Sequence, residues 1–394
     1  MGRYRVVSIN NRIEAELYLR EIGADEMGIK IMIPKAVFRA IRIRGVSSRA
    51  ANLIKQEMLA KGGEAALGRG AASAEGETDV LLMGTLRQYE LLIDKLSMQP
   101  FGLKKIARSL NDTLIGLEST GPKEIRLADG SNLTIGERTL VMGILNVTPD
   151  SFSDGGNYYN SEAAIARARE MLEQGADIID IGGVSTRPGA APVDRREEMD
   201  RILPVLEALR REFKGVPISI DTFDAEVARA ALAEGASLIN DVGGLKADSD
   251  MAGVISKNGC PVVVMHNRLG GGYGDLMAEV INDLEESLQI AEESGIEADQ
   301  VIIDPGVGFG KTPEQNLVLL KTLSELKVLD RPILLGVSRK SFIGKILDIP
   351  PQDRIEGSVA AAIVGITNGA SIIRVHDVLQ TKHAVMVCDA IMRA

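Results

Sequence analysis

The amino-acid sequence predicts an α/β protein in which a TIM (β/α)8 barrel follows a smaller α/β domain. Its 394 residues exceed the size of one ordinary domain. From about residue 123 onward, short segments rich in Val and Ile alternate eight times with segments of helical pattern, over the roughly 250 residues that such a barrel needs. Polar residues stand where nearly every predicted strand ends. We therefore expect two domains, residues 1–122 and residues 123–394.

The composition is that of an ordinary globular protein. Hydrophobic residues make up 45% and charged residues 25% of the chain, which excludes a disordered protein. No apolar run is long enough to span a membrane, and the N-terminus lacks the apolar region of a secretory signal. Two cysteines, Cys260 and Cys388, cannot form a disulfide framework and favour a cytoplasmic location. The net charge of −10 and 3% of aromatic residues argue against a nucleic-acid partner.

The first domain has mixed patterns. The segments 29–33 (IKIMI) and 79–85 (DVLLMGT) are predicted to be buried strands, and residues 48–63 have the apolar spacing of a helix that ends at Gly62. Residues 62–77 are rich in Gly and Ala and predict a mobile loop. We expect a small α/β domain whose role the sequence does not reveal.

One stretch of this domain is basic. No acidic residue occurs between Glu26 and Glu57. The basic residues in that interval include Lys35, Arg39, Arg42, Arg44 and Arg49. A solvated basic face is the simplest interpretation, and an anionic partner is the alternative. The domain is therefore either a module that senses a ligand or docks a partner, or a structural addition that extends a dimer.

The second domain begins with a predicted hairpin around Asp129-Gly130, a common turn dipeptide. Eight predicted strands follow. They cover residues 139–146, 177–183, 217–221, 237–241, 261–266, 301–305, 332–338 and 371–376. Their almost continuous hydrophobicity is typical of parallel strands that are covered on both faces.

The segments between these strands predict helices. Residues 160–174 carry an apolar stripe, and Asp224 is a candidate N-cap. Glycines are expected to close four helices, at Gly175, Gly235, Gly295 and Gly369. An open doubly wound sheet is the alternative, but it usually has fewer strands and a GxGxxG loop after the first, which this sequence lacks.

Polar residues follow or end the predicted strands. They are Asn146, Asp180, Asp221, Asn240, Asp241, His266, Asp304, Ser338, Arg374 and His376. Each one alone is readily explained by a hydrogen bond to a neighbouring loop. Together they predict an active site, because the C-terminal ends of barrel strands share one mouth.

The residue types at this mouth suggest a ligand. Carboxylates and carboxamides suit a flat heterocycle with several N–H donors, and the cations Arg187, Lys340, Arg374 and His376 suit a phosphate or pyrophosphate. No placed nucleophile is present, so the chemistry would depend on positioning and charge stabilisation. The loops 147–160 and 184–196 are candidate lids.

Eight motifs in this order resemble dihydropteroate synthase. They are GILNVTPDSFSDGG (143–156), GGVSTRPG (182–189), SIDT (219–222), IND (239–241), VVMH (263–266), DPGVGFGK (304–311), SRKSFIG (338–344) and RVHD (374–377). The resemblance implies a barrel enzyme of folate biosynthesis that joins 6-hydroxymethyl-7,8-dihydropterin pyrophosphate to para-aminobenzoate and releases pyrophosphate. It also implies Mg²⁺ and a homodimer.

The resemblance also implies roles for individual residues. The implied pterin contacts are Asp221, Asn240, Met265, Asp304 and Lys340. The implied pyrophosphate contacts are Asn146, Arg374 and His376, with Asn146 near the metal. The implied para-aminobenzoate pocket and lid residues are Asp150, Phe152, Thr186, Arg187, Pro188, Phe309, Lys340 and Ser341. Asp221, Lys340, Arg374 and His376 are the expected catalytic residues.

Two positions depart from the family pattern. Val184 replaces a common Glu, which affects the hinge of the second lid, and Val307 replaces a common Phe beside the para-aminobenzoate pocket. Two rival functions share the pterin acceptors. A methyltetrahydrofolate-type methyltransferase needs neither STRPG nor SRKS, and a non-catalytic pterin-binding protein would not need the three cations Lys340, Arg374 and His376.

Overall fold

The structure is a computed structural model that describes residues 4–73, 75–118, 121–147, 157–184, 193–268, 270 and 272–393. The chain divides into two compact units, Met1–Ser119 and Thr120–Ala394. Each unit has its own hydrophobic core. No helix of the described residues is long and apolar enough to cross a membrane.

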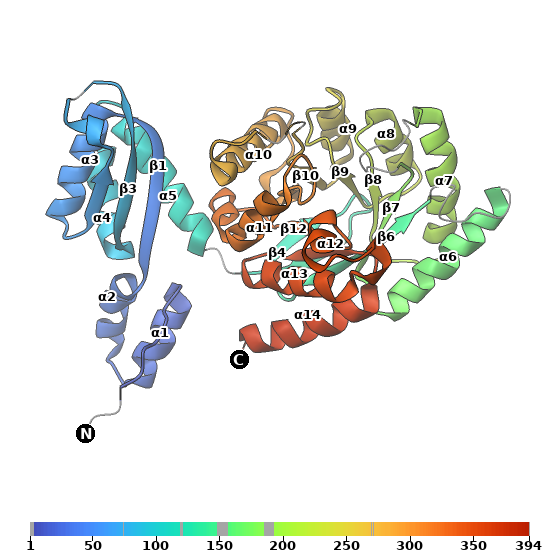
Figure 1. The fold of residues 1–394 in the computed structure, drawn as a ribbon, viewed down its shortest axis with the longest axis horizontal. Coiled ribbons are helices and arrows are strands. Elements are labelled where there is room, and N and C mark those ends of the chain that lie inside the picture. Colours follow the sequence, from blue (N-terminus) through green and yellow to red (C-terminus); the bar gives the residue numbers. More distant parts are fainter. Residues whose placement is uncertain are drawn as a thin grey trace. The chain divides into compact units, whose positions relative to one another are not determined.

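The first unit is a three-stranded antiparallel sheet with helices (Figure 1). The strands are β1 (Phe38–Ser47), β2 (Glu64–Leu67) and β3 (Glu77–Thr85), in the order β1-β3-β2. The helices are α1 (Arg12–Glu21), α2 (Glu26–Ala36), α3 (Ser48–Ala60), α4 (Leu86–Ser97) and α5 (Leu103–Glu118). Helices α3, α4 and α5 bury their apolar faces in the core of the unit. The predicted helix at 48–63 and strand at 79–85 are confirmed.

Two predictions for this unit are wrong. Residues 29–33 belong to helix α2, because Asp25 caps that helix by accepting a hydrogen bond from the backbone N–H of Gly28 at 2.9 Å. A short apolar run is compatible with either a strand or a helix, and the cap decides between them. Residues 62–77 contain strand β2 and a 3₁₀ helix (Arg69–Ser73), because β2 finds its partner in β3.

The basic run lies mainly on β1, where carboxylates neutralise it. Arg39 forms an ion pair with Glu118 at 2.7 Å, and Arg42 forms one with Asp79 at 2.6 Å. Arg44 also approaches Asp79, at 3.8 Å. The Arg42 guanidinium lowers the pKa of Asp79 below its usual value. This pairing weakens the argument for an anionic partner.

The second unit is a closed parallel barrel. Its strands are β6 (Leu140–Asn146), β7 (Ile178–Gly182), β8 (Ile218–Asp221), β9 (Leu238–Asp241), β10 (Val262–Met265), β11 (Val301–Asp304), β12 (Leu334–Gly336) and β13 (Ile372–Val375). They are hydrogen-bonded in the order β11-β10-β9-β8-β7-β6-β13-β12. A parallel bridge between Ile303 and Ile333 joins the two ends. The barrel prediction is confirmed, and the open sheet is excluded.

Helices surround these strands in Figure 1. They are α6 (Asn157–Glu173), α7 (Arg195–Glu212), α8 (Ala225–Ala233), α9 (Met251–Asn258), α10 (Leu276–Glu293), α11 (Pro313–Lys321), α12 (Ser341–Leu347), α13 (Ile355–Thr367) and α14 (Val378–Arg393). Outward-facing strand residues pack against them in one large core. The predicted N-cap is confirmed, since Asp224 accepts hydrogen bonds from the backbone N–H groups of Glu226 and Val227.

Inward-facing strand residues change character along the barrel axis. At the N-terminal ends they are apolar, and the hairpin of β4 (Lys123–Arg126) and β5 (Asn132–Ile135) packs against them. This layer contains Met142, Ile178, Leu238, Val263, Ile302, Leu334 and Ile372, with Ile125, Leu127, Leu133 and Ile135 from the hairpin region. At the C-terminal ends the inward residues are polar. The hairpin thus closes one end of the barrel, and functional groups occupy the other.

Candidate active site

A small cavity, partly open to solvent, lies at the C-terminal ends of the strands. Its lining residues come from most of the barrel strands and from three of the loops that follow them. They are Asp221, Asn240, Val242, Met265, Asp304, Val307, Phe309, Gly336, Lys340 and Arg374. Seven of these residues are among those that the sequence predicted for the site. Strand ends far apart in sequence therefore contribute to one site, as the barrel geometry requires.

Arg374 joins two carboxylates inside this cavity. Its Nε donates to Oδ2 of Asp180 at 2.6 Å, and its Nη2 donates to Oδ2 of Asp221 at 2.6 Å. The Asp180 side chain is fully buried, and the Asp221 side chain is 9% exposed. Such charge-assisted bonds are stronger than neutral ones. The guanidinium is therefore held at the mouth, next to the ligand space.

Burial controls the charge of these groups. It raises the pKa of Asp221 to about 7, with Arg374 opposing the shift and Asp180 adding to it. Burial lowers the pKa of Arg374, but the two carboxylates more than offset this effect and raise it above its usual value. Oδ1 of Asp180 and Oδ1 of Asp221 are buried without a hydrogen-bond partner among the described residues. These oxygens remain as acceptors for a ligand or for water.

Asp304 and Asn240 add further hydrogen-bond acceptors to those of Asp180 and Asp221. We call these four residues the acceptor wall. Oδ1 of Asp304 accepts a hydrogen bond from the backbone N–H of Gly306 at 2.7 Å, and burial raises the pKa of Asp304. The Asn240 side chain is 2% exposed, and its Nδ2 makes a long contact of 3.5 Å with Oδ2 of Asp180. Acids and amides therefore surround the cavity on neighbouring strands.

Lys340 lies against an aromatic ring of the same cavity. Its Nζ is 4.3 Å from the centre of the Phe309 ring, within the range of a cation–π interaction. Burial is the main cause that lowers the pKa of Lys340 to about 8, with Asp304 opposing the shift and Arg374 adding to it. Val307, which replaces a common Phe, is buried and lines the same cavity.

Asn146 and His376 stand at the ends of neighbouring strands of the barrel. Gly182 lies between Asn146 and Asp221, since a Cβ on Gly182 would be 3.6 Å from Oδ1 of Asn146 and 3.8 Å from Oδ2 of Asp221. Nδ1 of His376 lies 3.0 Å from Oγ of Ser338, and the His376 backbone N–H donates to the same hydroxyl at 3.2 Å. Neither residue lines the cavity itself: Asn146 ends β6, and His376 follows β13.

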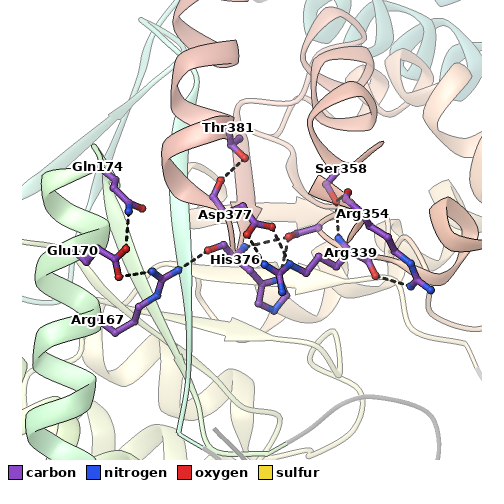
Figure 2. Close-up of polar contacts among 10 residues, drawn as sticks. Arg167, Glu170, Gln174, Arg339, Arg354, Ser358, His376, Asp377 and Thr381 are labelled. Carbon is purple, nitrogen blue, oxygen red and sulfur yellow. Dashed lines mark hydrogen bonds and ion pairs between the residues drawn. The ribbon is translucent and has the colours of Figure 1, made fainter. Parts of the chain in front are cut away.

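A second set of polar residues supports the segments that follow β12 and β13 (Figure 2). Arg167 on α6 donates to the backbone oxygen of His376 at 2.9 Å. Arg339 binds both carboxylate oxygens of Asp377, at 2.9 and 2.5 Å. Arg354 donates to the backbone oxygen of Arg339 at 3.0 Å. This network fixes the backbone on both sides of the loop that carries Lys340.

The sequence did not assign roles to these supporting residues. Arg339 adopts a left-handed backbone conformation with φ of 56°, and its N–H donates to Oγ of Ser358 at 2.8 Å. Their charges gave a signal, because Arg339 and Asp377 lie beside predicted site residues. Their pairing depends on the approach of β12 and β13 and is not visible in the sequence.

The remaining predicted residues fall into two groups. Ser341 opens α12 beside Lys340, but it is exposed and does not line the cavity. The lid residues fall outside the described part of the chain. They are Asp150, Phe152, Thr186, Arg187 and Pro188.

The described geometry suits a flat, nitrogen-rich ligand. Buried acceptors on β7, β8, β9 and β11 can bind ring N–H groups, and the Arg374 guanidinium lies beside them, where it can donate to an anionic substituent. No cluster of three metal-binding side chains occurs in the described ranges. A metal with most ligands from water and substrate remains compatible with Asn146.

Comparisons with known proteins agree with this geometry. The family model described as "Pterin binding enzyme" matches residues 142–376. Dihydropteroate synthase from Bacillus subtilis is 50% identical over 262 residues, which cover 66% of this chain and 92% of that protein. A solved dihydropteroate synthase from Xanthomonas albilineans, with 4-aminobenzoic acid, is 43% identical with a TM-score of 0.66. That likeness covers 70% of this chain and 100% of the solved one.

A further relative also matches the first unit. The probable bifunctional folylpolyglutamate synthase/dihydropteroate synthase of Halobacterium salinarum is 40% identical over 370 residues. The match covers 92% of this chain and 44% of that longer protein. The sequence motifs, the barrel with its acceptor-lined cavity and these likenesses agree: the chain belongs to the dihydropteroate synthase family of pterin binding enzymes.

Proposed function

We propose that the barrel is a dihydropteroate synthase. It joins 6-hydroxymethyl-7,8-dihydropterin pyrophosphate to para-aminobenzoate, forming 7,8-dihydropteroate and pyrophosphate. The single observation that carries this proposal is the convergence of Asp221, Asn240, Asp304, Lys340 and Arg374 on one cavity in a chain with dihydropteroate synthase relatives.

The pterin would bind against the acceptor wall. Asp221, Asn240 and Asp304 offer oxygens to its amino and ring N–H groups, and Met265 packs beside the ring. Lys340 donates to the oxygen or nitrogen edge of the ring. The buried, unpartnered Oδ1 of Asp221 supports this arrangement, because an unmet acceptor inside a protein is costly.

The pyrophosphate would lie beside Arg374 and His376. During the reaction the C–O bond to pyrophosphate breaks and a C–N bond to the aryl amine forms, and the amine loses one proton. Arg374 and His376 stabilise the negative charge on the departing pyrophosphate. Asp221 and Asp304 stabilise positive charge on the pterin methylene. Arg374 already lies between Asp180 and Asp221, so pterin binding to Asp221 releases its Nη2 for the pyrophosphate.

Magnesium fits this site as a substrate-bound ion. Mg²⁺ usually takes one or two protein oxygens together with water and phosphate oxygens, so the Asn146 carboxamide oxygen is a sufficient protein ligand. When bound, Mg²⁺ neutralises pyrophosphate charge and makes it a better leaving group. Asn146 itself orients the pyrophosphate at the end of β6.

The para-aminobenzoate would bind nearer the opening. Phe309 and Lys340 offer an aromatic face and a cation to the ring and its carboxylate, and Ser341 lies beside them. Thr186 and Pro188, with the lid residues Asp150, Phe152 and Arg187, are assigned to this pocket by the family resemblance. Closure of these loops would exclude water from the reacting methylene.

We propose further that the enzyme is a cytoplasmic homodimer. Adjacent helices α11, α13 and α14 expose large apolar side chains, among them Leu317, Val364 and Val387. Exposed apolar side chains on neighbouring helices suit a subunit interface. Both cysteines are free and buried, in keeping with a reducing compartment. Light scattering of the wild type and of Val387→Glu tests the dimer, which the added charge should weaken.

Pyrophosphate release tests the function directly. The wild type with both substrates and Mg²⁺ should release pyrophosphate and form dihydropteroate. Asp221→Asn and Lys340→Ala should abolish turnover and leave the far-UV circular dichroism unchanged. Asp299→Asn and Lys345→Ala alter exposed residues outside the cavity and should react normally. Near-normal turnover in Asp221→Asn or Lys340→Ala would contradict the assignment, and a methyltransferase would release no pyrophosphate.

A further inference from the structure

Lys311, which follows the cavity loop, is partly buried and bound to three acceptors. Its Nζ donates to the backbone oxygens of Gly306 at 2.9 Å and Phe309 at 3.2 Å. It also lies 2.8 Å from Nδ1 of His266. An ammonium group has three donors, so these contacts use all of them. Lys311 does not line the cavity, and the proposed mechanism gives it no role.

The contact with Lys311 fixes the protonation of His266. An ammonium group cannot accept a hydrogen bond, so Nδ1 of His266 must be the acceptor and Nε2 must carry the ring proton. The His266 side chain is fully buried at the end of β10. Burial and the nearby charge of Lys311 together lower the pKa of His266 to about 4, so the ring stays neutral near pH 7. The strand end thus supplies a permanent acceptor to Lys311.

The loop that Lys311 holds is tightly packed against β10 and the segment after it. Gly306 and Gly310 both have left-handed backbones, with φ of 67° and 58°. A Cβ on Gly306 would lie 2.0 Å from the backbone oxygen of His266, and one on Gly310 would lie 1.9 Å from that of Arg268. The loop therefore has little freedom to shift without losing these contacts.

This loop presents Phe309 to Lys340. The Phe309 backbone is held from both sides, because its N–H donates to the oxygen of Gly306 at 3.1 Å and its own oxygen accepts from Lys311. The ring then lies 4.3 Å from Nζ of Lys340. A contact path therefore runs from His266 through Lys311 and Phe309 to the cavity.

We propose that Lys311 and His266 are positioning residues that hold Phe309 in the orientation required by the aryl amine. The pair acts through the loop of residues 305–311, which follows β11, and touches neither substrate. The pterin acceptors lie mainly on the strands, where barrel hydrogen bonds hold them. Loss of the pair therefore affects the aryl amine more than the pterin. This inference rests on the proposed function for its substrates.

The experiment compares Lys311→Met with the wild type in the full-length protein. Met has a similar length and no donor, so Phe309 loses one backbone hydrogen bond and the loop loses its clamp. We expect the KM for para-aminobenzoate to rise about tenfold, as a difference of one net hydrogen bond implies. The Kd for the pterin pyrophosphate, measured by calorimetry, should change by less than about threefold. That change corresponds to less free energy than one net hydrogen bond. Lys321→Met, an exposed position on α11, is the matched control.

A pair of His266 variants tests the mechanism independently. In His266→Asn, a carboxamide oxygen replaces Nδ1 as the acceptor, so the KM for para-aminobenzoate should stay near the wild-type value. His266→Leu removes the acceptor and should reproduce Lys311→Met. The wild-type enzyme in the same assay tests the proposed function separately.

Several outcomes would overturn the positioning role. Unchanged KM values in Lys311→Met would show that the loop needs no clamp. Equal losses for both substrates, or the same change in Lys321→Met, would indicate a general structural effect. Loss of folding in both Lys311→Met and His266→Leu would make the pair a stability element only. Equal behaviour of His266→Asn and His266→Leu would exclude the hydrogen bond as the cause.

Discussion

Replacing Asp221 by Asn should abolish turnover and stabilise the protein at alkaline pH. The carboxylate is buried beside Asp180, and burial raises its pKa from 3.8 to about 7. An Asn side chain has nearly the same shape and cannot ionise. Its carboxamide oxygen can still accept the hydrogen bond from Arg374. The variant should therefore behave like the protonated form of the wild type at every pH.

The sign of the pH dependence follows from this raised pKa. The unfolded chain ionises Asp221 near pH 4, whereas the folded protein resists ionisation up to about pH 7. The stabilising effect of the neutral form is complete below pH 4 and is lost as the pH rises through 7. At 1.36 kcal/mol per pH unit, the interval corresponds to about 4 kcal/mol. Asp221→Asn should retain this stability and exceed the wild type by up to about 4 kcal/mol at pH 8.

Urea unfolding at pH 5, 6, 7 and 8 measures the difference between the two proteins. Other titrating groups affect both and largely cancel. Asp241→Asn is an instructive control, because burial raises the pKa of Asp241 to about 6 as well. Its two oxygens accept backbone N–H groups of Gly243 at 2.7 Å and Leu245 at 2.6 Å, so a carboxamide NH₂ would meet a donor and destabilise the protein at every pH. An Asp221→Asn variant less stable than the wild type at pH 8 would refute the reasoning.

Other predictions concern the cavity and the domain organisation. Phe309→Leu removes the ring beneath Nζ of Lys340. In steady-state assays the KM for para-aminobenzoate should rise several-fold, which corresponds to a loss of about 1 kcal/mol of binding free energy. The affinity for the pterin should not change. Gly306→Ala should yield little soluble protein, because the added Cβ would overlap the backbone oxygen of His266 and because the Gly306 backbone is left-handed. A yield and a melting temperature equal to those of the wild type would contradict this prediction. A fragment of residues 120–394 has its own core and matches nearly complete relatives, so it should release pyrophosphate at the full-length rate. A lower rate at equal folding would assign a regulatory role to the first unit.

The barrel was largely predictable because its signals are local. Each strand is a short apolar segment next to a glycine or polar residue, and the structure places all eight strands within a few residues of the predicted positions. The first unit was harder. Residues 29–33 have no clear period, and only the cap from Asp25 distinguishes the helix. Strand β2 was missed because its pairing with β3 supplies a stability that its small side chains do not indicate.

The candidate site was predictable in its members and less so in its contacts. Strand ends meet in any such barrel, so the convergence of acids, amides and cations followed from the fold class. The partners of Arg374 lie 153 and 194 residues earlier in the chain, and those of Lys311 include His266, 45 residues earlier. Such pairs depend on the depth at which each side chain enters the barrel, and the sequence alone does not specify that depth.

The β4–β5 hairpin has a consequence for the order of events in catalysis. The hairpin closes the barrel at the N-terminal ends of the strands. Reactants and products must therefore enter and leave through the single opening at the C-terminal ends. The pterin acceptors are nearly inaccessible to solvent, whereas Phe309 and Ser341 lie closer to the entrance. An amine seated first would obstruct the route to the deeper compartment. We therefore expect the pterin pyrophosphate to bind before para-aminobenzoate.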